Sequence, residues 1–359
     1  MSSGWLVVSV ALACAGASLA GREARLVTTT QGPVRGYRAL QGDHFEFHGI
    51  PYATVPTGAH RFMAPLPGPV WLQPLEATNN YTICPQFNRI PQTEFVIKED
   101  CLIANVYVPD TNEKNLPVLV IVHGGAYQNV DDIYALEEFY KSASLESLAS
   151  TAFLDRKDSS FVFSPCVERN TGVDIFLDDS PVNIIKQGKY KKVPVLYGFS
   201  NMEGLFRLNL FESWKDEMNS NFSMFLPIDL EFKNTEQREE VANVIKEFYF
   251  GSKPVGYDTI LSYIDYFSDV IFAYPTLRST KLQVEAGSKL IYLYEYSYPI
   301  SIFSSFFKPD PIPEYLKNVR GARHVAQTDA VLDSALAPPE DGDLTEQYIK
   351  HKKVMKELW

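Results

Sequence analysis

Residues 116 to 127 read Leu116-Pro117-Val118-Leu119-Val120-Ile121-Val122 and then His123-Gly124-Gly125-Ala126-Tyr127. The apolar run is short, unbroken and rich in β-branched residues, which is typical of a strand buried on both faces of a parallel sheet. The glycines that follow let the backbone pass close to a ligand and point its N–H groups at a reacting carbonyl, as in an oxyanion hole. They fit a tight turn at the end of a strand equally well.

Strand-like and helix-like patterns alternate along the rest of the chain. Strands are predicted over 25–39 (two, joined at residues 31–33), 103–108, 192–198 and 290–296. Helices are predicted over 131–155, 202–213, 234–249, 257–264, 269–286 and 344–359, the last with Leu344, Tyr348, Met355 and Leu358 roughly on one side. This alternation predicts an α/β sheet. No linker is long enough to separate domains, so we expect a single domain over residues 21–359.

The composition is that of a globular protein with an acidic surface. Of 359 residues, 45% are hydrophobic and 21% are charged, which excludes disorder along the whole chain. A formal net charge of −11 repels phosphate, so we expect no nucleic-acid partner. The 13% aromatic content indicates a large core, of the kind that can line an apolar cavity. The sequence contains no HExxH, no paired CxxC and no phosphate loop, so we infer neither metal nor cofactor.

The first 20 residues have the pattern of a secretory signal peptide. Residues 5–20 are apolar and end in the small-residue triplets Ala15-Gly16-Ala17 and Ser18-Leu19-Ala20, with cleavage expected after Ala20. The alternative is a buried apolar helix. The run is too short for a membrane span, and no later stretch reaches that length. We therefore expect a secreted, extracellular protein that does not span a membrane.

Several separate motifs resemble those of the type-B carboxylesterase and cholinesterase family of α/β-hydrolases and follow one another in the same order along the chain. Their sequences are most similar to those of insect esterases. They are Phe47-His48-Gly49-Ile50-Pro51-Tyr52-Ala53, Arg61-Phe62 with Pro65 and Pro67, Glu99-Asp100-Cys101-Leu102, Asn105-Val106-Tyr107-Val108-Pro109 and residues 123–127. The resemblance covers residues 27–129 and again about 132–359. It implies an α/β-hydrolase fold with a mostly parallel sheet flanked by helices.

The resemblance also implies roles for individual residues. Gly124, Gly125 and Ala126 correspond to the oxyanion hole, Glu203 to the acid of a catalytic triad, and His324 to its base. The family reaction is hydrolysis of a carboxylic ester by a Ser-His-Glu triad. We therefore expect a small apolar ester or a related molecule as the ligand, and no obligate protein partner.

Cysteines and sequons predict the modifications of a secreted chain. The segment around Cys101 resembles the disulfide-bearing segment of the family, which implies a bond to Cys84, and closing this loop would contribute about 3 kcal/mol. Cys166 is then a free thiol, interpreted as a small buried hydrophobe. Asn80-Tyr81-Thr82 and Asn221-Phe222-Ser223 are acceptor tripeptides for glycans.

One element of the family is missing from the sequence. No Gly-x-Ser-x-Gly pentapeptide occurs, although the family places one between residues 123–127 and the acid. The match breaks near Asn129-Val130, which indicates an internal deletion near residues 129–131 that removes the central nucleophile strand. Without that strand, the strand at 117–122 is left unpaired or pairs anew with the strand near 193–198. The sequence also ends at Leu358-Trp359, within a helix that the family continues.

Two other patterns imitate functional motifs. Ser200 lies in Gly198-Phe199-Ser200-Asn201-Met202, between a strand and a helix, as a nucleophile would. The fifth residue is methionine where the strained elbow requires glycine, and Ser200 lies only three residues before Glu203, so we do not assign it as the nucleophile. His44 and His48 have a metal-like spacing, but their stretch alternates like a strand, and we interpret them as scaffold residues.

Four functional hypotheses remain open from the sequence. The chain is an inactive or truncated secreted carboxylesterase, a non-catalytic binding or adhesion protein, an active esterase that uses Ser200, or an incomplete or alternatively spliced product. Activity against a short-chain aryl ester separates the third hypothesis from the others. Secretion yield and cooperative melting separate the second from the fourth. From this sequence we predict that the chain is catalytically inactive, because the nucleophilic serine is missing.

Overall fold

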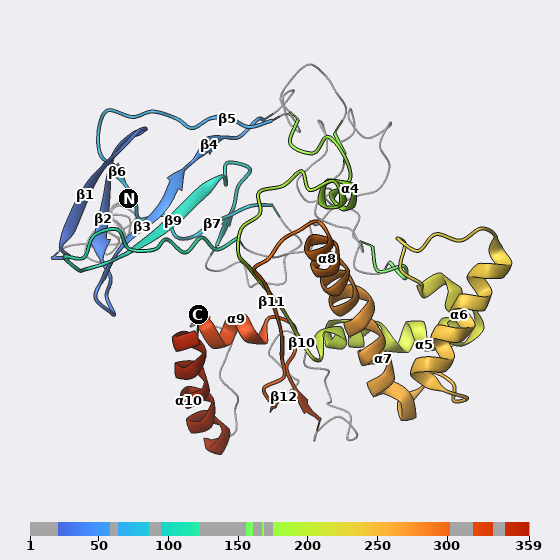
Figure 1. Cartoon of the computed structure of the whole chain (residues 1–359). Coiled ribbons are helices and arrows are strands. Elements are labelled where there is room, and N and C mark those ends of the chain that lie inside the picture. Colours follow the sequence, from blue (N-terminus) through green and yellow to red (C-terminus); the bar gives the residue numbers. More distant parts are fainter. Residues whose placement is uncertain are drawn as a thin grey trace, which may run out of the picture. The chain divides into compact units, whose positions relative to one another are not determined.

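A computed structural model describes residues 21–57, 64–85, 95–122, 156–160, 167–168, 175–301, 319–332 and 342–358 (Figure 1). The predicted signal peptide, the glycine-rich residues 123–127, the helix expected over 131–155 and Cys166 lie outside these residues. Contacts within the chain group into two compact units, Met1–Phe153 and Leu154–Trp359.

The first unit contains an antiparallel sheet. In order across this sheet, its strands are β1 (Ala24–Thr29), β2 (Gly32–Arg38), β3 (His44–Pro51) and β9 (Ile103–Pro109). Shorter pairings are β6 (Leu75–Glu76) with β2, β4 (Ala53–Thr54) with β5 (Leu66–Pro67), and β7 (Thr82–Ile83) with β8 (Val96–Ile97). The strands predicted over 25–39 and 103–108 are confirmed.

One face of this sheet packs on a small core. Burial alternates along β2 and β3, as expected for strands with one covered face. The buried residues are Val34, Phe45, Phe47 and Ala77. The Arg25 guanidinium lies 3.7 Å from the centre of the Phe45 ring and pairs with Asp110 at 2.7 Å, which covers the outer edge of this core.

His44 and His48, whose spacing imitates a metal site, both lie on β3. Their ring centroids are 6.1 and 5.4 Å from that of Tyr107 on β9. Burial lowers the pKa of His48, which favours a neutral ring. Among the described residues, no group of three or more His, Cys, Asp or Glu could hold a metal ion. The ring contacts with Tyr107 place both histidines in the packing between β3 and β9.

The segment Leu116–Val122 departs most from the sequence prediction. It forms no strand, and its large apolar side chains are exposed, including Val118 at 85% and Val122 at 87%. The prediction of a strand buried on both faces is wrong for these residues. A parallel strand needs at least one neighbouring strand for its backbone hydrogen bonds. No strand in the described part of the chain pairs with this segment.

The second unit contains a parallel pair of strands, β10 (Val195–Ser200) and β11 (Ile291–Tyr296), which lie side by side in Figure 1. Both strands were predicted from their apolar runs. Helix α8 (Tyr274–Glu285) packs against both of them. A Cβ at Gly198 would lie 2.0 Å from the ring of Tyr294, so a larger residue there would have to displace that ring. The parallel pair with helices between its strands confirms the α/β class, whereas the larger sheet of the first unit is antiparallel.

Helices between β10 and β11 make up most of the second unit. They are η3 (Glu203–Leu210), α5 (Phe211–Ser220), η4 (Phe222–Phe225), α6 (Thr235–Phe250), η5 (Tyr257–Thr259), α7 (Ile260–Ser268), η6 (Asp269–Ala273) and α8, and α4 (Pro181–Lys186) precedes β10. The predicted helices are confirmed, although η3 is a 3₁₀ helix and η6 is a π-helix. The side chain of Asn234 accepts the N–H of Gln237, which caps the start of α6.

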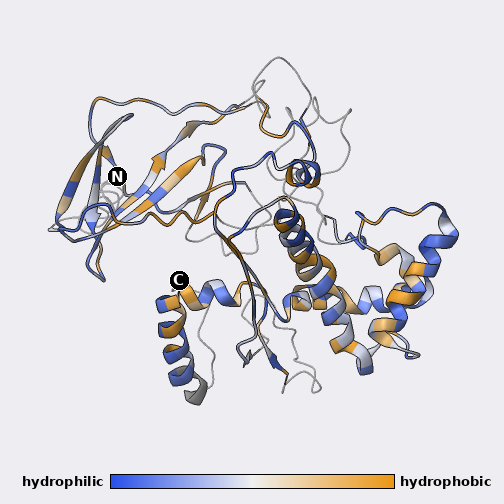
Figure 2. Ribbon diagram, in the orientation of Figure 1, coloured by the Kyte–Doolittle hydropathy of each residue, from blue (hydrophilic) through white to orange (hydrophobic). Residues whose placement is uncertain are grey.

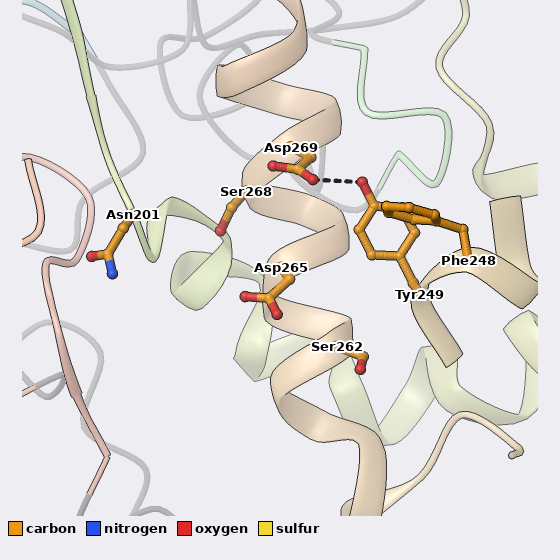
Figure 3. Close-up of a pocket in the computed structure, with 7 residues that line it drawn as sticks. All are labelled: Asn201, Phe248, Tyr249, Ser262, Asp265, Ser268 and Asp269. Atoms are coloured by element: carbon orange, nitrogen blue, oxygen red, sulfur yellow. Dashed lines mark hydrogen bonds between the residues drawn. The ribbon is translucent and has the colours of Figure 1, made fainter. Parts of the chain in front are cut away.

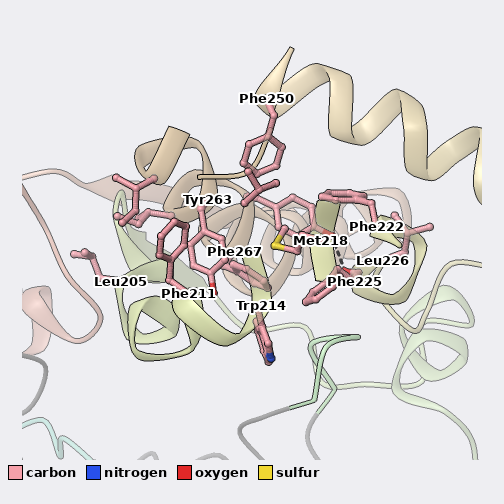
Figure 4. Close-up of a cluster of buried hydrophobic side chains, with 14 of the residues drawn as sticks. Leu205, Phe211, Trp214, Met218, Phe222, Phe225, Leu226, Phe250, Tyr263 and Phe267 are labelled. Carbon is pink, nitrogen blue, oxygen red and sulfur yellow. Dashed lines mark hydrogen bonds between the residues drawn. The ribbon is translucent and has the colours of Figure 1, made fainter. Parts of the chain in front are cut away.

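An aromatic core joins these helices (Figure 4). Rings from α5, η4 and α7 meet edge to face, as aromatic pairs prefer. The hydroxyl of Tyr263 donates to the carbonyl of Arg207 at 3.0 Å, and that of Tyr266 donates to the carbonyl of Phe225 at 2.6 Å. Burial raises the pKa of both tyrosines. The large core that the aromatic content predicted is confirmed in this unit.

The C-terminal elements pack on the end of the parallel pair. They are β12 (Ile300–Ser301), β13 (Arg320–Gly321), α9 (Ala326–Val331) and α10 (Gly342–Leu358). Hydrophobic and hydrophilic residues alternate along α10 in Figure 2. Tyr348 and Met355 are buried as predicted, but Leu358 is 73% exposed because the described chain offers nothing to pack against the last turn. Among the described helices, none has the length and apolar character that crossing a membrane requires.

Candidate active site

The turn after β10 places Glu203. Strand β10 ends at Ser200, and η3 begins at Glu203. The N–H of Gly204 donates to Oγ of Ser268 on α7 at 2.8 Å. A Cβ at residue 204 would lie 2.2 Å from the carbonyl oxygen of Ile264, so only glycine allows this close approach. Glu203 is therefore fixed on a turn that is packed against a core helix, and it is only 2% exposed.

A second loop, 121 positions further along the chain, places His324. The N–H of Met202 donates to the carbonyl of Ala322 at 2.9 Å. The N–H of Ala322 in turn donates to Oδ1 of Asn201 at 2.9 Å. One backbone bond and one bond to the Asn201 side chain therefore join the turn that holds Glu203 to the loop that holds His324.

Glu203 and His324 are brought together by these two segments. Oε2 of Glu203 lies 2.6 Å from Nδ1 of His324, and Oε1 accepts the N–H of Ser200 at 2.8 Å. Both carboxylate oxygens therefore have a donor. The His324 side chain is 40% exposed, so the pair joins a buried carboxylate to an accessible imidazole.

This contact fixes the tautomer of the neutral His324 ring. A carboxylate only accepts hydrogen bonds, so Nδ1 carries the hydrogen and Nε2 keeps its lone pair. Among the described residues, none hydrogen-bonds to Nε2. A ring in this state can take a proton at Nε2, which is what the base of a triad does.

A buried ion pair, which the sequence did not single out, holds the loop around His324. Arg323 pairs with Asp329 at 2.7 Å, and both side chains are almost fully buried. Arg323 also donates to the carbonyl of His324 at 3.0 Å. Val325 has a left-handed φ of 61°, which is a strained conformation for a β-branched residue. In the sequence, Arg323 and Asp329 are only two opposite charges six positions apart. Exposed charges often have the same spacing, so the pattern did not predict a buried ion pair.

Two aromatic rings flank His324, and neither was assigned from the sequence. The centroid of the His324 ring lies 6.0 Å from that of Phe206 on η3 and 5.0 Å from that of Phe272 on η6. The two phenyl rings meet edge to face. Both residues are partly exposed, so they form an apolar wall beside the accessible imidazole. Only the high aromatic content of the chain hinted at such a wall.

Ser200 has the environment of a structural residue. It is 1% exposed, and its hydroxyl donates to Oε1 of Gln327 on α9 at 2.7 Å. Its backbone N–H donates to Glu203. The hydroxyl therefore has a partner other than His324, which agrees with the interpretation that Ser200 is not a nucleophile.

The remaining predicted residues fall into two groups. Gly124, Gly125 and Ala126 lie outside the described residues, so their predicted role stays a prediction. Cys84 and Cys101 form a disulfide with their Cα atoms 5.1 Å apart. The predicted glycan acceptors Asn80 and Asn221 are both exposed.

A polar pocket lies on the side of α7, but it does not include the acid and the base (Figure 3). The hydroxyl of Tyr249 donates to Asp269 at 2.6 Å, and burial together with this bond raises the pKa of Tyr249. Burial and the nearby charge of Asp269 raise the pKa of Asp265. Ser268 lines the same pocket and accepts the N–H of Gly204. The pocket thus lies next to the acid turn as an acidic, hydrogen-bonded cluster.

The chain order of these parts defines an α/β-hydrolase: a strand of a parallel pair, an acid in the turn that follows it, and a histidine in a later loop. The model of the Carboxylesterase family matches residues 23–133 and 129–359. These two matches span most of the chain, so the chain belongs to the carboxylesterase family.

Known relatives and a solved structure agree with this assignment. Para-nitrobenzyl esterase of Bacillus subtilis (strain 168) is 44% identical over 111 residues, which are 29% of this chain and 22% of that protein. Venom carboxylesterase-6 of Apis mellifera is 23% identical over 422 aligned residues, with 76% of this chain and 74% of that protein covered. The crystal structure of juvenile hormone esterase from Manduca sexta matches with a TM-score of 0.71 at 19% identity, over 93% of this chain and 90% of that chain. This likeness confirms the α/β-hydrolase fold.

Proposed function

We propose that this chain is a secreted carboxylesterase-family protein that keeps the acid and the base of an ester-hydrolysing triad and lacks its serine. The family reaction transfers the acyl group of a small apolar ester to serine and then to water. Glu203 would orient His324, and Gly124, Gly125 and Ala126 would hold the oxyanion. Because no Gly-x-Ser-x-Gly serine occurs in the sequence, the chain would not hydrolyse esters at ordinary enzyme rates.

The observation that carries this proposal is the 2.6 Å contact between Glu203 and His324. A buried carboxylate that orients an accessible imidazole is the arrangement a triad base requires. Ser200, which occupies the elbow-like position, donates its hydroxyl to Gln327 instead. These two contacts support an acid–base pair of Glu203 and His324 and a structural role for the one serine with an elbow-like sequence.

The comparisons support a deletion as the origin of this state. The two family matches meet at residues 129–133, where the resemblance also breaks in the sequence. The alignment with the Apis mellifera relative has 422 positions, but 76% of 359 residues is only about 273 residues of this chain. About 149 aligned positions are therefore without a residue from this chain, which is ample for a strand, an elbow serine and the helix after it.

Hydrolysis of naphthyl acetate by the purified full chain tests the proposal. Loss of a triad serine costs on the order of 10⁶ in kcat, so we expect no turnover at esterase rates. Ser200→Ala is the informative variant, and Ser213→Ala, at an exposed serine, is its matched control. An ordinary esterase rate that Ser200→Ala abolishes and Ser213→Ala leaves intact would overturn the proposal.

The aromatic wall favours a second role, non-catalytic binding of a small apolar ester or related ligand. Phe206 and Phe272 would hold an apolar group beside His324. Titration with a naphthyl ketone, followed by tryptophan fluorescence, measures such binding. We expect Phe272→Ala to weaken binding and Phe248→Ala, at a ring that is mostly exposed, to leave it unchanged. Equal affinity in both variants would remove the binding role from this wall.

Secretion and glycosylation are part of the same proposal. The Apis mellifera relative is a venom carboxylesterase, which supports a secreted chain here. The exposed Asn80 and Asn221 would accept glycans. Expression with residues 1–20 in insect cells should yield a chain in the medium that starts at Gly21 and loses mass on glycosidase treatment. A chain found only inside the cell would count against this part.

A further inference from the structure

We propose that His324 itself accepts acyl groups from activated aryl esters, which makes it a site of covalent acylation that needs no serine. This inference rests on the proposed function, because a serine held beside Nε2 would take the acyl group in its place. It assigns to the Glu203–His324 pair an activity that differs from proton transfer in a triad. Histidine is one of the side chains that can form a covalent intermediate with a substrate.

The geometry prepares Nε2 of His324 to act as a nucleophile. The contact of Nδ1 with Glu203 at 2.6 Å leaves the lone pair of the neutral ring on Nε2. The side chain is 40% exposed, so an ester can approach it. Arg323, through its bond to the carbonyl of His324 and its buried pair with Asp329, holds the backbone beneath the ring.

The other described histidines lack this combination. Nε2 of His351 lies 2.8 Å from the hydroxyl of Tyr296, and the His351 ring stacks on Tyr298 at 3.8 Å. His44 is 30% exposed and resembles His324 in accessibility, but its nearest carboxylate, Glu46, is itself partly exposed and lies 3.6 Å from Nε2. His44 is therefore a matched control for an accessible imidazole without an orienting carboxylate at Nδ1.

The surroundings of His324 select the class of acyl donor. Imidazole displaces weakly basic leaving groups such as aryloxides far more readily than alkoxides. Phe206 and Phe272, whose rings contact each other, form an apolar wall on one side of the His324 ring and would hold the aryl group of the ester edge to face. The ligand class is therefore a short-chain aryl ester.

The reaction would run in two balanced steps. Nε2 of His324 attacks the acyl carbon, the new N–C bond forms, and the aryloxide leaves with the electron pair of the broken C–O bond. The acyl-imidazolium shares its Nδ1 proton with Glu203. Water then adds to the acyl carbon and the N–C bond breaks. One proton of the water stays with the carboxylic acid and the other passes from Nε2 to the solvent, which regenerates the neutral imidazole, with one water consumed for each ester.

Acylation by p-nitrophenyl acetate tests this inference on the purified full chain. We expect a rapid release of p-nitrophenolate of up to one equivalent, followed by slow turnover. Peptide mapping after an acid quench should place an acetyl group on His324, and the rate constant for acetylation of His324 should be about tenfold or more above that of His44.

Variants test whether this histidine causes the fast release. His324→Gln should remove the fast phase, and His44→Gln should leave it unchanged. Glu203→Gln, with an unchanged far-UV spectrum, should slow it about tenfold or more, because the tautomer is no longer fixed.

The outcomes separate this inference from the proposed function. Equal labelling of His324 and His44, or a fast phase that survives in His324→Gln, would overturn the inference while the missing serine still stands. Turnover at ordinary rates with a fluorophosphonate-labelled serine would overturn the proposed function and the inference with it. Phe272→Leu adds a check on specificity: we expect slower acylation by the aryl ester and no change at His44.

Discussion

Leu116–Val122 and β10 (Val195–Ser200) have the same kind of sequence and opposite surroundings. Both are short apolar runs that predict a buried parallel strand. β10 pairs along its whole length with β11 and packs against α8, with Leu196 as its one exposed large apolar residue. Leu116–Val122 has no pairing among the described strands and exposes its valines to solvent. An apolar run therefore becomes a strand only when the chain supplies a neighbour for its backbone.

The same contrast explains why Glu203 and His324 keep their contact. Glu203 and His324 lie on segments that are tied to β10, α7 and α9 by hydrogen bonds and a buried ion pair. None of these contacts involves residues near 129–131. A deletion at that place would therefore remove the partner of Leu116–Val122 and leave the acid–base pair in position.

The largest expected effect comes from breaking the ion pair beneath His324. Asp329→Asn leaves Arg323 buried without its charge partner, and such losses cost about 3–5 kcal/mol. Asp229→Asn breaks the partly exposed pair with Arg278 and should cost less than about 1 kcal/mol. Urea unfolding of both variants measures the difference. Equal losses would mean that the His324 loop is no better anchored than the protein surface.

A smaller effect is expected at the acid turn. In Gly204→Ala the new methyl group meets the backbone of α7, so we expect overpacking to cost about 1–3 kcal/mol. Gly256→Ala is a matched control, because its nearest neighbour would be 4.0 Å away. Thermal melting of the two variants decides the matter. If Gly204→Ala melts like the parent chain, the turn is looser than the hydrogen bond to Ser268 indicates.

Charged substitutions in the exposed segment Leu116–Val122 should change the free energy of unfolding very little. Val118→Lys combined with Val120→Glu replaces exposed valines, so we expect a change of stability within about 0.5 kcal/mol for each site. We also expect less binding of a hydrophobic dye and less aggregation, because an exposed apolar run invites association. Dye fluorescence and light scattering measure this. A loss of several kcal/mol would show that these residues are buried, and the contrast with β10 would fail.

The smallest effect is a pH dependence at His351. Burial lowers the pKa of this ring below 6.5 in the folded chain. As the pH falls below 6.5, the unfolded chain binds the proton first, so this contribution to stability is complete above pH 6.5 and is lost as the pH falls through the folded-state pKa. Urea midpoints at pH 8 and pH 5.5 should differ less in His351→Gln than in the parent chain. An unchanged difference would assign the slope to other groups, such as His48.

Much of the fold could be read from the sequence. Local patterns predict the strands of the first sheet, β10, β11 and the long helices. The reason is that apolar residues recur in each of these segments with the period of a strand or a helix. The pairing of Cys84 with Cys101 and the choice of Glu203 and His324 came from motifs, and the structure brings each of these pairs together. The absence of the Gly-x-Ser-x-Gly pentapeptide is also a property of the sequence alone.

Only the tertiary structure decided which segments find partners. Leu116–Val122 has a strand's sequence and no strand, because parallel pairing depends on a neighbour that is distant in the chain. Leu358 fits the apolar side of its helix and is exposed, because nothing in the described chain covers that turn. The buried pair of Arg323 and Asp329 and the rings of Phe206 and Phe272 around His324 depend on where separate loops and helices meet. Local sequence sets the periodicity of a segment, whereas burial and charge pairing are set by the packing of segments that are far apart in the chain.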